Sequence, residues 1–222
     1  MNKTIVLSLF FVLLSSWILA APVAYTNKAS FLSNVSVVSP QSINFDSYDA
    51  GTILTNQTIS GITFRSPGSI PLQVINASSG VRNPMVSSSG TKILSPGGSN
   101  LTQEEDDLEL IFANPLRAFG MDVIFDTPDG ASFVSASFYD ASNNLIHQIG
   151  PHIPAPTGGI TFVGLVADSV LISRVVIDDF DPSAPDDHIA YDSLVFCPVP
   201  EPTSFLLLCL ASLGMALILK RK

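Results

Sequence analysis

The sequence predicts an all-β protein, an antiparallel β-sandwich of jelly-roll type, between two short segments of a different kind. From Ile43 onward, short apolar runs are separated by Gly, Pro, Asn and Asp, with a turn signal roughly every ten residues. Several of these runs alternate apolar and polar residues with a period of two, as strands with one buried face do. No part of the body keeps a helical period over ten or more residues.

The first twenty residues have the order of parts of a secretory signal peptide. Met1-Asn2-Lys3 is basic, residues 4–19 are uncharged and mostly apolar, and two small residues, Ala20 and Ala21, follow. We expect cleavage after Ala20, because cleavage after Ala21 would place Pro22 at the scissile bond. An uncleaved membrane anchor is the alternative.

After this segment we expect a leader or first edge strand over residues 21–41 and the sandwich domain over residues 42–198. Alternation is clearest where Phe119, Met121, Val123 and Phe125 share one face, and where Val134, Ala136 and Phe138 do. Long loops are expected at 78–100, which is rich in Ser and Gly, and at 150–159, which holds three prolines. The candidate strands are 59–64, 72–75, 108–112, 118–125, 133–139, 145–149, 161–166, 173–177 and 189–196.

The body is strongly acidic. The whole chain has a net charge of −9, and the two ends contain Lys3, Lys220, Arg221 and Lys222 but only one acid, Glu201. Such a surface excludes nucleic acid as a partner, because phosphate binding needs Lys and Arg. Divalent cations are better candidates, and a solvated acidic surface that keeps the protein soluble is the alternative.

The densest acidic cluster lies between residues 178 and 192 and indicates a candidate calcium site. Calcium takes oxygen ligands, which carboxylates in a proline-bent loop supply. Asp192 is expected on the inward face with Leu194 and Phe196, where a carboxylate needs a metal or a hydrogen-bond partner. The candidate ligands are Asp46, Asp179, Asp181 and Asp192, and a solvated acidic loop is the alternative.

Nothing in the sequence nominates a catalytic residue, and we expect no enzyme activity. The chain has neither the HExxH zinc motif nor the GxSxG nucleophile motif. The acidic run at 104–107, together with Glu109, reads as a solvated face. Tyr48, Tyr139 and Tyr191 are the candidates for an exposed aromatic surface that binds sugars, since alternation places each opposite an apolar set; a half-exposed strand residue is the alternative for each. The one tryptophan, Trp17, lies in the signal segment, which disfavours a flat sugar-binding surface.

The C-terminal segment, residues 199–222, predicts a short membrane anchor. Residues 204–219 are sixteen uncharged residues, about 24 Å as a helix against a bilayer core of about 30 Å. We therefore assign the helix to 203–219. The basic residues Lys220, Arg221 and Lys222 follow at once and favour the cytoplasmic side, which leaves the body outside.

Pro200-Glu201-Pro202, the apolar helix and the basic end together resemble the PEP-CTERM sorting signal of Gram-negative bacteria that make extracellular polysaccharide. The resemblance implies export by the Sec translocon and transient anchoring in the inner membrane. It also implies cleavage by an exosortase, a membrane-embedded protease for which Pro200, Glu201 and Pro202 are recognition residues. An ordinary single-pass anchor is the alternative.

The body is more weakly similar to jelly-roll carbohydrate-binding modules. The residues that carry this likeness are the segments at 43–46, 61–64, 162–164 and 190–196. In those modules acidic residues near the first and last strands often bind a structural calcium. By this likeness the matching residues are Asp46 and Asp192.

From these observations we expect an exported, non-enzymatic protein of the cell surface or extracellular matrix, associated with extracellular polysaccharide. The alternatives are a calcium-stabilised carbohydrate-binding module and a secreted hydrolase with an unrecognised site. Removal of the tail would leave Cys197 as a lone thiol in an oxidising compartment. It is expected to stay free, with pairing between chains as the alternative.

Overall fold

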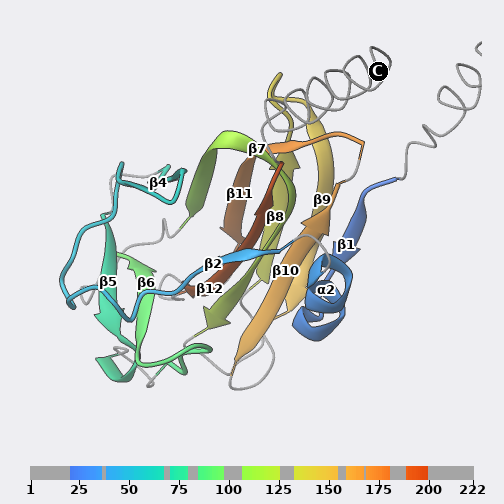
Figure 1. Cartoon of the computed structure of the whole chain (residues 1–222). Coiled ribbons are helices and arrows are strands. Elements are labelled where there is room, and N and C mark those ends of the chain that lie inside the picture. Colours follow the sequence, from blue (N-terminus) through green and yellow to red (C-terminus); the bar gives the residue numbers. More distant parts are fainter. Residues whose placement is uncertain are drawn as a thin grey trace, which may run out of the picture.

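The computed structural model describes residues 21–36, 39–67, 71–79, 85–97, 107–125, 133–154, 159–167, 169–180 and 189–199 (Figure 1). All the strand pairs are antiparallel, which confirms the predicted fold class. In chain order the elements are β1 (Val23–Tyr25), α2 (Lys28–Val35), β2 (Gln41–Ile43), β3 (Thr58–Ile59), β4 (Ile62–Arg65), β5 (Leu72–Asn76), the 3-10 turn η2 (Ala77–Ser79), β6 (Lys92–Pro96), β7 (Leu108–Phe125), β8 (Phe133–Tyr139), β9 (Leu145–Pro154), β10 (Ile160–Val166), β11 (Ile172–Phe180) and β12 (Ile189–Pro198).

Strand β7 belongs to both layers of the sandwich. Its first part, residues 108–112, lies between β4 and β11, and its second part, residues 116–125, lies between β10 and β12. Ala113 and Asn114, between the two parts, are exposed. The strand therefore switches sheets at a solvent-exposed bend, and its hydrogen bonds make the two layers one continuous network of twelve strands. Figure 1 shows β7 curving at this bend.

The first layer contains β1, β10, residues 116–125 of β7, β12, β2, β6 and β5, and the second contains β3, β4, residues 108–112 of β7, β11, β8 and β9. One apolar core fills the space between them. Phe119, Met121 and Val123 come from the first layer, and Leu110 and Phe138 from the second; all are fully buried in this cluster. The alternation read from the sequence therefore identified the core-facing residues of β7 and β8 correctly.

Helix α2 covers the outer face of the first layer, and the sequence did not predict it. Asn27 caps it, since the Asn27 side chain accepts a hydrogen bond from the Ser30 N–H group at 2.9 Å. Phe31 and Val35, four residues apart, share one face of the helix and are buried against the sheet. In Figure 1 the helix lies beside β1 and β10.

The ring of Phe162 on β10 packs beneath this helix. It lies 5.2 Å from the ring of Phe31, measured between centroids. The space for it depends on Gly120 of β7, because a Cβ atom at that position would lie 2.4 Å from the Phe162 ring. Cys197 belongs to the same small cluster; it is a free thiol, fully buried, and its burial raises its pKa.

Several predicted boundaries were wrong. Residues 59–64 form a hairpin rather than one strand, because Ser60 and Gly61 have positive φ and make a turn between β3 and β4. The predicted strands 108–112 and 118–125 are parts of one strand. β6 lies inside the predicted loop 78–100, and β9 continues to Pro154, into the predicted loop 150–159.

No helix within the part of the chain that the structure describes is long and apolar enough to cross a membrane. The predicted signal peptide, residues 1–20, and the predicted helix at 203–219 lie outside the described residues.

The packing of α2 gives a matched pair of variants. Phe31 is fully buried, whereas its neighbour Leu32 is 36% exposed. We expect Phe31→Ala to lower the free energy of unfolding by about 3–5 kcal/mol, since it empties a packed site. Leu32→Ala should change it by no more than about 0.5 kcal/mol. Urea denaturation measures both, and equal losses would contradict the docking of α2.

Candidate functional site

The outer face of the second layer carries two adjacent rows of side chains that run across its strands. The strand register places them in line: Thr63, Ile111, Arg174 and Tyr139 in one row, and Arg65, Glu109, Val176, Ser137 and Gln148 in the next. Their neighbours along the strands, such as Phe64, Leu110 and Phe138, are fully buried. The two rows therefore point away from the core, and we call these nine residues the Tyr139 face.

Two arginines and a glutamate organise the Tyr139 face. The Arg174 guanidinium lies 4.2 Å from the centre of the Tyr139 ring, a cation–π contact. Arg174 Nη1 donates to Glu109 Oε1 at 2.9 Å, and Arg65 Nη1 lies 3.9 Å from Glu109 Oε2. The Arg65 side chain is 51% exposed. The face thus carries a partly exposed aromatic ring, covered on one side by Arg174, and charged groups that are fixed by contacts with one another.

Of the three tyrosines considered for a sugar-binding surface, Tyr139 alone lies on this face. Tyr48 is partly buried and packs against the core. Tyr191 is fully buried in the core, so its expected exposure was wrong. Sequence reasoning missed Arg174 and assigned Glu109 to an acidic run. The available signal was the position of Glu109 between Leu108 and Leu110, which places its side chain opposite two buried residues.

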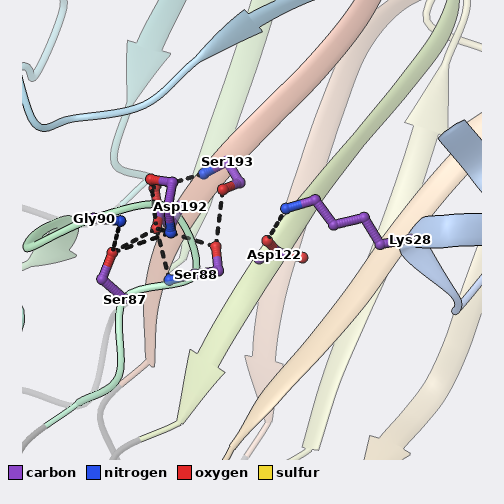
Figure 2. Close-up of polar contacts among 8 residues, drawn as sticks. Lys28, Ser87, Ser88, Gly90, Asp122, Asp192 and Ser193 are labelled. Atoms are coloured by element: carbon purple, nitrogen blue, oxygen red, sulfur yellow. Dashed lines mark hydrogen bonds and ion pairs between the residues drawn. The ribbon is translucent and has the colours of Figure 1, made fainter.

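Asp192 on β12 is fully buried and is surrounded by the serines that precede β6 (Figure 2). Its Oδ2 accepts hydrogen bonds from the Ser87 hydroxyl and from the N–H groups of Ser88 and Ser89, each at 2.9 Å. Its Oδ1 accepts from the Ser89 hydroxyl at 2.8 Å and from the Ser193 N–H group at 2.7 Å. This many donors satisfy a buried carboxylate and fix the loop to the strand.

The expectation that Asp192 shares the inward face with Leu194 and Phe196 was wrong. Ser193 has a φ of 51°, and the register between β12 and β7 shifts by one residue after Asp192, which marks a β-bulge. The extra residue reverses the alternation, so Asp192 lies on the outer side of the first layer.

Asp122 of β7 is the cross-strand partner of Asp192, and it is also almost fully buried. Like charges in directly opposite positions destabilise a sheet. The two negative charges are compensated by different partners. Asp122 Oδ2 forms an ion pair with the Lys28 ammonium of α2 at 2.5 Å, and Asp192 accepts hydrogen bonds from the serines that precede β6 (Figure 2). Each carboxylate therefore holds one covering segment on the outer face of the first layer.

Asp46 contacts the same loop from another direction. Its Oδ1 accepts hydrogen bonds from the N–H groups of Thr91, at 2.7 Å, and Lys92, at 3.1 Å. The Thr91 bond is the main reason that the pKa of Asp46 lies below its usual range, although partial burial opposes it. At Gly90 a Cβ atom would lie 2.1 Å from Asp46 Oδ2, so glycine allows this close approach.

Asp46 and Asp192, two of the candidate calcium ligands, therefore meet one loop, residues 87–92. In this arrangement both oxygens of Asp192 and Oδ1 of Asp46 accept hydrogen bonds from N–H and hydroxyl donors, which fix the loop. A cation would need oxygen ligands that are free to bind it. Within the described ranges no three His, Cys, Asp or Glu side chains form a metal-binding group. Calcium stays a prediction, which a calcium titration followed by thermal melting can test.

The structure does not describe the side chains of the other predicted site residues. The side chain of Asp179 and all of Asp181 lie outside the described part, as do the expected cleavage residue Ala20 and the sorting residues Pro200, Glu201 and Pro202. The basic residues Lys220, Arg221 and Lys222 are also outside it.

Solved structures with similar folds come from several kinds of module. The K2 cleaved adhesin domain of Lys-gingipain is 11% identical, with a TM-score of 0.45, and the match covers 71% of this chain and 99% of that one. The K3 domain from Porphyromonas gingivalis is 14% identical, with a TM-score of 0.40, covering 71% and 98%. The CBM22-1 xylan-binding domain of Xyn10C from Paenibacillus barcinonensis is 11% identical, with a TM-score of 0.38, covering 69% and 99%. Likenesses this weak say nothing about the ligand of this chain.

No curated protein matches the chain. Residues 198–222, however, match the PEP-CTERM protein-sorting motif, as the sequence indicated. The match begins at Pro198, the last residue of β12. The chain thus carries the signal of an exported protein that is anchored transiently in the membrane, cleaved by an exosortase and delivered to the cell surface or beyond.

The burial of Asp192 predicts the effect of removing its charge. In Asp192→Asn, one carboxylate oxygen becomes an NH₂ group that faces N–H and hydroxyl donors. We expect a loss of about 1–3 kcal/mol in the free energy of unfolding, measured by urea denaturation. Asp178→Asn makes the same change at an exposed position of β11 and should cost less than about 0.5 kcal/mol. Equal losses of stability in the two variants would contradict the role of Asp192 in fixing the loop at 87–92.

The lowered pKa of Asp46 predicts a pH-dependent contribution to stability. The group is more acidic in the folded than in the unfolded chain, so its contribution is present above about pH 4 and is lost as the pH falls through the folded pKa. The deficit of Asp46→Asn relative to wild type should therefore shrink between about pH 7 and about pH 3 in urea denaturation. Asp49→Asn, three residues away and exposed, is the control; a deficit independent of pH would contradict the prediction.

Proposed function

We propose that the protein is a non-enzymatic component of the cell surface or extracellular matrix, and that it binds extracellular polysaccharide through the Tyr139 face. The observation that carries the proposal is the arrangement of Arg174 over the Tyr139 ring beside Glu109. A sugar offers apolar C–H groups on its ring faces and hydroxyl groups around the rim. Aromatic and apolar side chains suit the first, and charge-assisted hydrogen bonds suit the second.

The location of this face supports the proposal. It lies on a sheet, which keeps its side chains rigid, and spans β4, β7, β11, β8 and β9. The apolar side chains of Ile111 and Val176 lie between the polar groups and are partly exposed. A long polymer could contact several strands at once, so that many weak contacts add up.

The absence of catalysis is part of the same proposal. Glu109 is held between two arginines, and Asp122 and Asp192 are engaged by Lys28 and the serine loop. Glycoside hydrolysis uses two carboxyl groups that face each other across the bound sugar, one of them protonated. Carboxylates committed to cations and N–H groups are poorly placed for such work.

The test is binding of the purified protein to the extracellular polysaccharide of its own host, measured by co-sedimentation. We expect Tyr139→Ala and Arg174→Ala to weaken the apparent Kd by about tenfold each, the effect of losing a central contact. Val86→Ala, which shortens an exposed apolar side chain elsewhere, should bind as wild type does. Tyr139→Phe should retain most of the binding, since it keeps the ring.

Equal binding by all variants would remove the Tyr139 face from the proposal, and no binding by wild type would overturn the function itself. Release of new reducing ends from the polysaccharide during incubation would show a hydrolase instead.

A further inference from the structure

The folded body ends very close to the point where the membrane anchor begins. β12 ends at Pro198, and the Val199 N–H group still bonds the Pro115 carbonyl at the bend of β7, at 3.5 Å. Only residues 200–203 separate Val199 from the apolar run that starts at Ser204. The five steps from Val199 to Ser204 span at most about 18 Å when fully extended.

This tether is short compared with the body. A domain of this size is about 30–40 Å across by its expected radius of gyration, while the headgroup layer on each side of a bilayer is about 5–8 Å thick. While the tail is in the membrane, the end of the sandwich at the β7 bend therefore stays within about 10–13 Å of the headgroup layer, much less than the width of the body.

The strand register shows which residues share that end, which we call the corner end. Pro198 and Ile172 both pair with Leu116, just after the bend. Val166 pairs with Ala118 and, on its other side, with Val23. The corner end therefore comprises the start of β1, the bend at 113–115, the described part of the loop from β10 to β11, and the end of β12.

The surface of the corner end suits lipid. Val23 is 50% exposed and Val170, in the loop before β11, is 41% exposed. A pocket of about 170 Å³ opens there between the Ser60–Gly61 turn and Pro198, with Phe112 and Phe196 among its lining residues. The buried carboxylates Asp122 and Asp192 lie six residues along their strands from Leu116 and Pro198, roughly 20 Å away.

We propose that the corner end is a lipid-contacting surface, on which the body rests in the headgroup layer until the tail is cut. Val23 and Val170 are its apolar contacts, and the short connection after Val199 keeps them there. The proposal depends on the membrane anchor and not on polysaccharide binding, so either can fail without the other.

The mature chain offers a clean probe, because the single tryptophan, Trp17, lies in the predicted signal peptide. Protein that begins at Ala21 and keeps the C-terminal tail lacks the apolar signal segment and Trp17. Carrying Val170→Trp, it would be reconstituted into phosphatidylcholine–phosphatidylglycerol vesicles, with and without bromine high on the acyl chains. We expect the fluorescence of Val170→Trp to shift to the blue and to lose intensity with brominated lipid. Val86→Trp, at an exposed position next to the loop at 87–92, is the matched control, and its fluorescence should keep its intensity.

A second variant tests the tether. A flexible Gly-Ser insertion between Val199 and Pro200 leaves the body and the anchor unchanged, and it should reduce the quenching of Val170→Trp. Equal quenching at both tryptophan positions, or none at Val170→Trp, would overturn the proposal. The second of these results would mean that the corner end does not meet lipid.

Discussion

The rest of the structure depends on one strand, β7, being central in both layers. Each of its two parts has a hydrogen-bonded neighbour on both sides, so four strands are positioned by a single stretch of 18 residues. The bend at 113–115 sets how the layers face each other, and Pro115, which lacks an N–H donor, suits a place where the ladder changes partners. A shift in β7 would therefore disturb the core and both outer faces together.

The two outer faces of the sandwich differ in what covers them. On the first layer, α2 and the loop at 87–92 cover the sheet, and each is tied down by one buried carboxylate, Asp122 or Asp192. Such contacts cost desolvation, which the ion pair of Asp122 with Lys28 and the several hydrogen bonds of Asp192 offset. On the second layer the charged groups lie at the surface and bond one another. One face thus serves stability, and the other is available for a partner.

The parts of the fold that could be predicted are those that depend on local alternation. β8 was predicted with its correct bounds, and the inward residues of β7 were identified. Helix α2 was missed because it has eight residues, and its signals, Asn27 as a cap and the Phe31–Val35 spacing, lie in a segment rich in Ser and Asn. The Lys28–Asp122 pair joins residues 94 apart, which no local pattern reveals.

The residues of the candidate site were also predicted correctly only where regular alternation holds. Alternation placed Tyr139 on an outer face correctly, but Tyr191 and Asp192 were assigned to the wrong sides. The bulge at Ser193 reverses the alternation within β12, and a serine with positive φ leaves no mark in the sequence that separates it from the other serines. The likeness that paired Asp46 with Asp192 did bring together two residues that meet the same loop, although the structure shows hydrogen bonds in that place.

The burial of Cys197 has a consequence for a protein that works outside the cell. Its thiol is enclosed between the sheet and α2, and burial raises its pKa, so little thiolate forms and oxidants or other thiols have no approach. The native fold therefore protects the thiol from oxidation, and copies released into an oxidising medium would not be cross-linked through this residue. A chain in which β12 detached would expose the thiol, and disulfide-linked aggregates would then contain the partly unfolded molecules.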